Sequence, residues 1–172
     1  MNSKILYGLI IALVVGFVGF VAFRNVDKAP EQSRPGIAHA NLGREHVKSK
    51  VYGGDEPPTS GPHAADLPWK AYNEEIPDVN AIHNLEHGGI YISYRPDLAK
   101  DQVDKIKALF TEPFSDPNFT PRKVIIAPRA NNKSPIVMSS WLRSEKFPSY
   151  DKQPMIDYYL KNLGKSPEPL AS

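Results

Sequence analysis

Cysteine is absent from all 172 residues of this chain. Without thiols, the protein has no disulfide framework and no thiolate metal site. A chain without cysteine fits either side of a membrane, so this absence leaves the compartment open.

An excess of one charge is also missing. Lys and Arg total 21 against 19 Asp and Glu, a formal net charge of +2. A field of that size does not indicate a nucleic-acid partner. No internal repeat is visible. Proline is abundant instead, at 17 residues, and most prolines fall between periodic segments. This distribution predicts a loop-rich domain rather than a helix bundle.

Charge is locally absent from Ile5 to Phe23, a run of apolar and small residues. A helix of this length reaches about 28 Å, close to the hydrocarbon thickness of a bilayer. The apolar part of a cleaved signal peptide is shorter, about 7–15 residues, and ends in small residues. Here the run ends in Phe23-Arg24. We therefore expect an uncleaved transmembrane anchor, with a removed signal peptide as the alternative.

The charges around this run bear on its orientation. Lys4 precedes it, whereas Arg24, Lys28 and Arg34 follow it, a bias that by itself keeps the C-terminal side in the cytoplasm. Large domains translocate largely regardless of such charge, and a start-anchor with a tiny N-terminal tail is a common export device. We expect a single-pass protein of the cell membrane, with its domain on the extracytoplasmic side.

The remaining boundaries follow from composition. We expect a short N-terminal tail over 1–4, the anchor over 5–23, a stalk over 24–43, a globular domain over 44–164 and a frayed tail over 165–172. His39 falls in the stalk, and we interpret it as solvated.

The periodicity of the domain predicts an α+β fold, a small, mostly antiparallel sheet with helices packed on it. A short helix begins after Asp78 as its cap, and the last helix, capped by Asp151, places Leu160 inward. The strand 136–141 is expected to pair antiparallel with 123–127. The expected strands are 47–52, 90–95 (half-buried), 123–127 and 136–141, and the expected helices are 79–87, one opened by Pro96-Asp97, and one after Asp151.

Histidines are concentrated in one part of the domain, at His46, His63, His83 and His87. His83 and His87 are four residues apart and share one side of a helix. The proline-rich stretch before His63 is stiff, so it can present that imidazole in a fixed place. Imidazoles converging on one ion are the usual ligands of zinc or copper. Alternatively, each histidine is hydrogen-bonded locally and the glycines after His87 serve only a tight bend.

Two neighbouring patterns refine this hypothesis. His83-x-x-Glu86-His87 matches the inverted zincin motif, in which the glutamate activates a metal-bound water. However, the expected helix is short and no later acid is marked as a third ligand. Glu86 is equally suited to orient a ligating imidazole. Met138, on a predicted strand, is a candidate copper ligand, although an interior methionine is more often core.

The motifs of the domain resemble a known family. They are Arg44-Glu45-His46-Val47, Val51-Tyr52, Pro57-Pro58-Thr59-Ser60-Gly61-Pro62-His63, His83-Asn84-Leu85-Glu86-His87-Gly88 and Ser140-Trp141. Together they are similar to the family catalogued as domain of unknown function 3105, from about Arg44 to the last helix. The resemblance implies a prokaryotic, membrane-anchored, extracytoplasmic protein and no established activity. It also places His46, His63, His83, Glu86 and His87 in the signature motifs. Many relatives carry a cysteine near Tyr72, which this chain lacks.

Three functions remain open from the sequence. The first is binding of a copper or zinc ion, for metal handling or sensing, through His63, His83 and His87, with His46 or Met138 as a fourth ligand. The second is a zinc-dependent hydrolase with Glu86 as general base. The third is a non-metal module in which the proline-rich loops and Trp69 bind a protein partner of unknown identity. We therefore expect the membrane as a partner through the N-terminal helix and no nucleic acid, and the sequence leaves the identity of any protein partner unknown.

Overall fold

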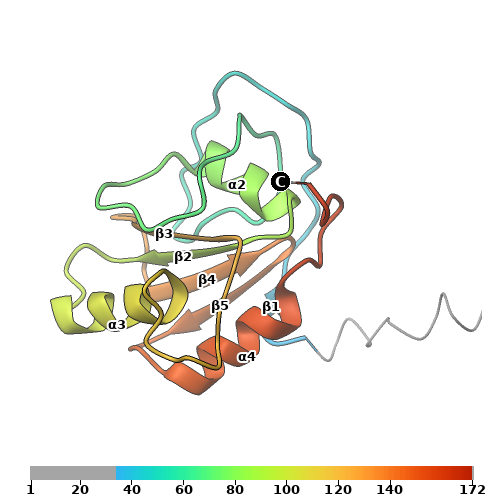
Figure 1. Cartoon of the computed structure of the whole chain (residues 1–172). Coiled ribbons are helices and arrows are strands. Elements are labelled where there is room, and N and C mark those ends of the chain that lie inside the picture. Colours follow the sequence, from blue (N-terminus) through green and yellow to red (C-terminus); the bar gives the residue numbers. More distant parts are fainter. Residues whose placement is uncertain (1–33, 172) are drawn as a thin grey trace, which may run out of the picture. The chain divides into compact units, whose positions relative to one another are not determined.

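The computed structural model describes residues 34–171 (Figure 1). The expected anchor over 5–23 and the tail over 1–4 lie outside these residues. Among the described helices, none is both long and apolar enough to span a bilayer.

A five-stranded mixed sheet forms the centre of the domain, as the predicted α+β class requires. The strands stand in the order β1-β5-β4-β2-β3; β2 and β3 are parallel and all other neighbours are antiparallel. The strands are β1 Ile37–Ala38, β2 Ile90–Tyr94, β3 Val124–Pro128, β4 Ile136–Ser140 and β5 Arg143–Phe147, and the helices are α2 Asp78–Glu86, α3 Lys100–Phe110 and α4 Lys152–Asn162.

Helices cover both faces of the sheet (Figure 1). On one face, α3 and α4 pack against β2, β3 and β4 in a core that contains Ile92, Ile126 and Met138. On the other face, α2 packs through Ile82 and Leu85 against Tyr91 and Ile125. Because both faces are covered, all five residues of β2 are buried, and the expected half-buried strand is wrong.

The pairing of the strands differs from the expected hairpin. Strand β3 does not pair with β4. It pairs with β2 in parallel, and helix α3 connects these two strands along the chain. Strand β4 lies between β2 and β5. Strand β5 was not predicted, because its residues Arg-Ser-Glu-Lys-Phe carry no apolar alternation. The outer edge of β3 is covered by the loop at Lys70–Tyr72, which exchanges backbone hydrogen bonds with Ile126. That cover protects an otherwise open sheet edge.

Several details predicted from the sequence differ in the structure. Residues 47–52 form no strand; only an isolated bridge joins His46 to His63. Leu160 is 61 % exposed on α4 rather than inward. Asp78 is the first residue of α2, not its cap, and its carboxylate binds Arg129 at 3.0 and 2.8 Å. On α3, the exposed side chains of Asp101 and Lys105 form an ion pair at 3.0 Å.

The two predicted flanks make contacts with the domain. The stalk was expected to run to Gly43, but β1 pairs with β5, and Arg143 donates to the carbonyl of Gly36 at 2.8 Å. The tail was expected to fray, yet the amide of Glu168 donates to the carbonyl of Glu86 at 3.1 Å. Lys123 also donates to the carbonyls of Pro169 and Ala171. Both flanks are thus hydrogen-bonded to the rest of the domain and are part of its structure.

Candidate metal centre

The C-terminal end of helix α2, just before Gly88 and Gly89, carries three polar side chains of the site. His83 and Glu86 are one turn apart, and His87 follows directly as the C-cap. Ile82 and Leu85, fully buried beneath, hold the opposite face of the helix on the sheet. The helix is thus fixed by apolar contacts while its polar side faces the proline-rich loop.

Two extended segments bring the remaining histidines to this helix. The backbone around Glu45 to Val47 runs parallel to Gly61–His63, with amide-to-carbonyl distances of 2.8 Å from His63 to Glu45 and from Val47 to His63. This pairing sets the rings of His46 and His63 side by side, with centroids 4.7 Å apart. Segments separated along the chain by the proline-rich loop therefore meet at one place.

Tyr52 fixes the loop that carries His63. Its hydroxyl donates to the carbonyl of Pro62 at 2.6 Å. Burial and the nearby Asp78 carboxylate raise the pKa of Tyr52, which keeps this donor protonated. Gly61 has φ +124°, and a Cβ there would lie 2.6 Å from the tyrosine oxygen, so only glycine fits.

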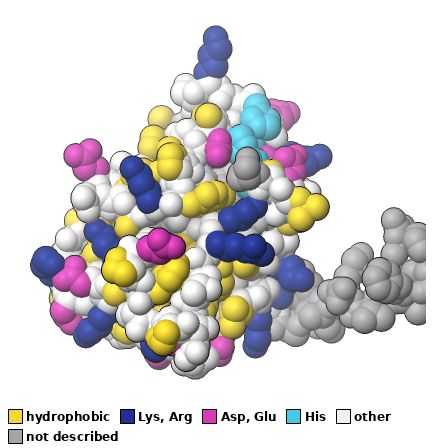
Figure 2. Space-filling model, in the orientation of Figure 1, with side chains coloured by type: hydrophobic (Ala, Val, Ile, Leu, Met, Phe, Trp, Pro, Cys, Tyr) yellow, Lys and Arg dark blue, Asp and Glu magenta, His cyan; other side chains and the backbone are white. Residues whose placement is uncertain are grey.

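Four side chains converge at the centre. His46, His63, His83 and Glu86 each offer one ligand atom, and these atoms all lie within 4.8 Å of one another. The centroid of the His83 ring lies 5.0 Å from that of His46 and 4.9 Å from that of His63. Histidine side chains gather on this side of the molecule, next to acidic and basic ones (Figure 2). The structure thus brings together three histidines and one glutamate that could hold a metal ion.

Two of the histidines are oriented by backbone carbonyls. The Nδ1 atom of His63 lies 2.9 Å from the carbonyl oxygen of Gly61, and that of His83 lies 2.6 Å from the carbonyl oxygen of Ala64. A carbonyl only accepts, so Nδ1 carries the proton in both rings. In the neutral imidazole, Nε2 then holds the lone pair, which is the arrangement typical of metal-ligating histidine.

The two most buried groups face each other without a hydrogen bond. Nε2 of His63 lies 2.9 Å from Oε2 of Glu86, with the side chains 0 % and 1 % exposed. Neither atom has a hydrogen-bond partner within the described part of the chain. A lone pair opposite a carboxylate in a dry site is unfavourable unless a cation lies beside both. The pair is therefore arranged for a proton or a metal ion.

Arg44 and Glu168 form the outer border of the centre. The Arg44 guanidinium lies 3.8 Å from Oε1 of Glu86 and 3.4 Å from the carboxylate of Glu168. It therefore approaches one oxygen of Glu86 and leaves Oε2 toward the histidines. We did not predict either residue as part of the site: Arg44 belongs to a signature motif without a recognisable role, and nothing in the tail marks Glu168.

The other predicted ligands occupy different positions. Nε2 of His87 lies 3.0 Å from Nε2 of His83, next to the four converging residues. Met138 is fully buried in the core between the sheet and α3 and α4, on the face opposite to α2, so it is not brought to the histidines. His39 is exposed and lies 2.7 Å from the hydroxyl of Ser144.

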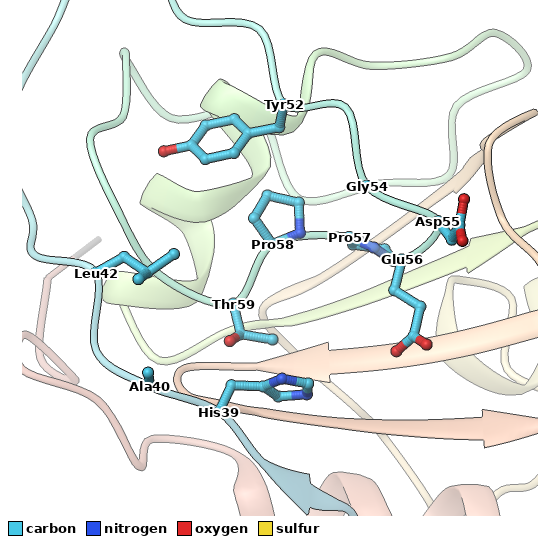
Figure 3. A pocket seen from close by; sticks show the side chains of 10 residues that line it. All are labelled: His39, Ala40, Leu42, Tyr52, Gly54, Asp55, Glu56, Pro57, Pro58 and Thr59. Atoms are coloured by element: carbon cyan, nitrogen blue, oxygen red, sulfur yellow. The ribbon is translucent and has the colours of Figure 1, made fainter.

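A pocket of about 460 Å³ is lined by residues of the segments 39–42 and 52–59 (Figure 3). Tyr52, Leu42 and the two prolines Pro57 and Pro58 contribute to its walls. None of the four converging residues lines it. Its acidic residues are already paired, Asp55 with Lys133 and Glu56 with Lys146. The pocket thus adds no ligand to the centre, although Tyr52 is shared between its wall and the support of the loop.

Comparison with known proteins identifies the family of the domain. Residues 46–172 match the family described as "Protein of unknown function (DUF3105)", so the chain belongs to it. That match confirms the family predicted from the motifs. The comparisons with curated proteins and with solved structures find no match.

Proposed function

We propose that this domain binds one divalent transition-metal ion through His46, His63, His83 and Glu86. The observation that carries the proposal is the buried contact between Nε2 of His63 and Oε2 of Glu86, which has no hydrogen bond and needs a cation. A proton could neutralise this pair alone. The convergence of two further imidazoles on the same place is the reason to favour a metal ion.

The spacing of the rings supports a shared ion. Zinc–nitrogen bonds of about 2.0–2.1 Å at tetrahedral angles place imidazole centroids about 5 Å apart. The three rings have centroids 4.7, 5.0 and 4.9 Å apart. The ligand atoms span up to 4.8 Å, wider than a closed tetrahedral shell, so the four side chains draw closer together when an ion binds.

The ligand set favours zinc or copper in the divalent state. Imidazole nitrogens and one carboxylate oxygen are borderline donors, suited to Zn²⁺ and Cu²⁺. The chain has no thiolate, and Met138 is on the other face of the sheet, so soft donors that select Cu⁺ are missing from the described site.

Metal handling or sensing fits this site better than turnover. Glu86 is 1 % exposed, its Oε2 is among the converging ligand atoms, and Arg44 approaches its other oxygen. A carboxylate that binds the ion is a poor general base for an attacking water, which disfavours the hydrolase hypothesis. His46 is exposed, which supports entry and release of an ion from solvent. With the anchor expected over 5–23, we place this activity on the extracytoplasmic side of the cell membrane.

Metal content tests the proposal. The purified full chain, stripped with a chelator, is titrated with Zn²⁺ and separately with Cu²⁺ by calorimetry, and the bound metal is measured by elemental analysis. We expect one ion per chain for wild type, none for His63→Ala with His83→Ala, and one for the matched control His39→Ala. A wild type that takes up neither ion would overturn the proposal. Equal binding by the double variant would show that the ion is bound by other residues.

A further inference from the structure

His83 cannot keep its present contact with His87 and also bind an ion. Its Nδ1 donates to the carbonyl of Ala64 at 2.6 Å, so Nε2 carries the single available lone pair. That same Nε2 atom lies 3.0 Å from Nε2 of His87. If the lone pair accepts a hydrogen bond from His87, it is unavailable to a metal. Binding of an ion through His83 therefore breaks the hydrogen bond between the two imidazoles.

The backbone keeps His87 beside the site after that bond is broken. Its amide donates to the carbonyl of His83 at 3.0 Å, and its own carbonyl accepts from Lys123 at 3.1 Å. The following Gly88 accepts from the amide of Gly164 at 2.8 Å. His87 is thus held on both sides of its Cα, and only its side-chain torsions are available for adjustment.

Two contacts in the cluster are as short as the distance between two donor atoms bound to the same metal ion. For bonds of about 2.0–2.1 Å, two ligands at a right angle are about 2.9 Å apart, whereas tetrahedral ligands are about 3.4 Å apart. His83 and His87 are separated by 3.0 Å between Nε2 atoms, and His63 and Glu86 by 2.9 Å between Nε2 and Oε2. Both values match the right-angled edges of a five-coordinate ion. Zinc sites that keep an open position can expand to five ligands.

We propose that His87 is a fifth, exchangeable ligand, which gives up its hydrogen bond to His83 and binds the ion that His83 binds. This inference rests on the proposed metal site and adds a mechanism of binding: the His83–His87 hydrogen bond gives way to the ion, and the metal-bound site has four imidazoles and one carboxylate. His87 stands outside the group of atoms that lie within 4.8 Å of one another, so its ring turns inward as the ion enters.

Nitrogen NMR of the histidine side chains tests the exchange directly. The full chain, labelled with ¹⁵N, is recorded without metal and with one equivalent of Zn²⁺. We expect the coordinating nitrogens of His46, His63, His83 and His87 all to move to metal-bound shifts, while His39 stays unchanged. If His87 keeps its metal-free shifts while the other three move, the fifth ligand is refuted and the proposed metal site stands. If none of the four moves, the metal site itself is refuted.

Affinity gives a second readout. His87→Ala should weaken Zn²⁺ binding at least about tenfold without changing the stoichiometry, and His39→Ala should leave the affinity unchanged. The Cu²⁺ form of His87→Ala should show one coupled imidazole fewer than wild type by pulsed electron paramagnetic resonance. An equal number of coupled imidazoles, with unchanged Zn²⁺ affinity, would contradict the exchange.

Discussion

Tyr91 lies on the α2 side of the sheet, fully buried, with a hydroxyl that has no hydrogen-bond partner among the described residues. Burial first, and then the negative charge of Asp78, raise its pKa far above the ordinary value. The neutral phenol is thus strongly preferred in the folded chain. In the unfolded chain the phenol ionises near pH 10. The contribution of Tyr91 to the free energy of unfolding is therefore fully present below about pH 10 and is lost as the pH rises above it.

Tyr91→Phe should therefore flatten the alkaline loss of stability. At neutral pH the variant should be as stable as wild type or slightly more so, because it removes a buried hydroxyl without a partner. Urea unfolding at several pH values between 7 and 11 measures this. Tyr72→Phe is the comparison: burial raises the pKa of this partly buried phenol as well, but the large shift is at Tyr91, so Tyr72→Phe should flatten the alkaline decline less. A parallel alkaline decline in wild type and Tyr91→Phe would contradict the expectation.

Asp78 and Arg129 form a buried ion pair beneath the start of α2, with side chains 10 % and 5 % exposed. Arg129 also donates to Asn132 at 3.1 Å and to the carbonyl of Gly54 at 2.9 Å. Asp78→Ala leaves the guanidinium buried without its counter-charge, so we expect a loss of about 3–5 kcal/mol in the free energy of unfolding. Urea unfolding measures it. Asp101→Ala, which removes an exposed partner of Lys105, should cause no measurable change.

At the scale of elements, the turn between α2 and β2 joins the metal centre to the sheet. Gly88 has φ +81°, and a Cβ on Gly89 would lie 2.4 Å from the ring of Trp69 and 2.8 Å from the carbonyl of Lys123. The sequence suggested a tight bend here. Only the structure shows that the bend is tight because an indole and a neighbouring strand approach the backbone.

Gly89→Ala should consequently disturb both stability and metal binding. We expect a loss of about 1–3 kcal/mol from overpacking, and a weaker site because α2 shifts relative to the loop of His63. Thermal unfolding and Zn²⁺ titration check the two effects. Gly53→Ala, where an added Cβ meets nothing within 4 Å, is the matched control. Wild-type behaviour of Gly89→Ala would show that the indole can move aside without cost.

Elements with strong local periodicity were predictable, and those defined by partners were not. Helix α3 follows from its apolar spacing and from the pair Asp101–Lys105. Strand β5 carries Arg143 and Glu145, and it is a strand because β1 and β4 pair with it on either side. Residues 47–52 alternate but find no strand partner, so local pattern alone misleads there.

At the scale of the whole molecule, the proposed ion links three regions that are distant along the chain: the segment at His46, the loop at His63 and helix α2. An ion that binds only the folded state stabilises it by mass action. Loss of the ion should therefore loosen the loops more than the sheet, whose core on the α3 and α4 face is separate from the centre.

A saturating metal should raise the stability of the whole domain. At a free Zn²⁺ concentration of 100 times Kd, we expect about 2.7 kcal/mol in the free energy of unfolding, reversed by a chelator. Urea unfolding with Zn²⁺ and with chelator measures the difference. His63→Ala with His83→Ala should show no such increase, and His39→Ala should show the full one. Chelator-insensitive unfolding of wild type would favour the protein-interaction hypothesis instead.

The sequence by itself determined the residue types available for chemistry. It showed a chain without thiols, histidines confined to His39 and four positions from His46 to His87, and a helical spacing that puts His83 and His87 on one side. It also carried the motifs that place the chain in its family.

Only the tertiary structure decided which of these residues meet. The parallel pairing of the segment at His46 with His63, the approach of Glu86 to His63 and the exclusion of Met138 by the sheet all depend on contacts between distant segments. Such contacts depend on burial and on backbone hydrogen bonds across long loops, and neither is encoded in the spacing of neighbouring residues.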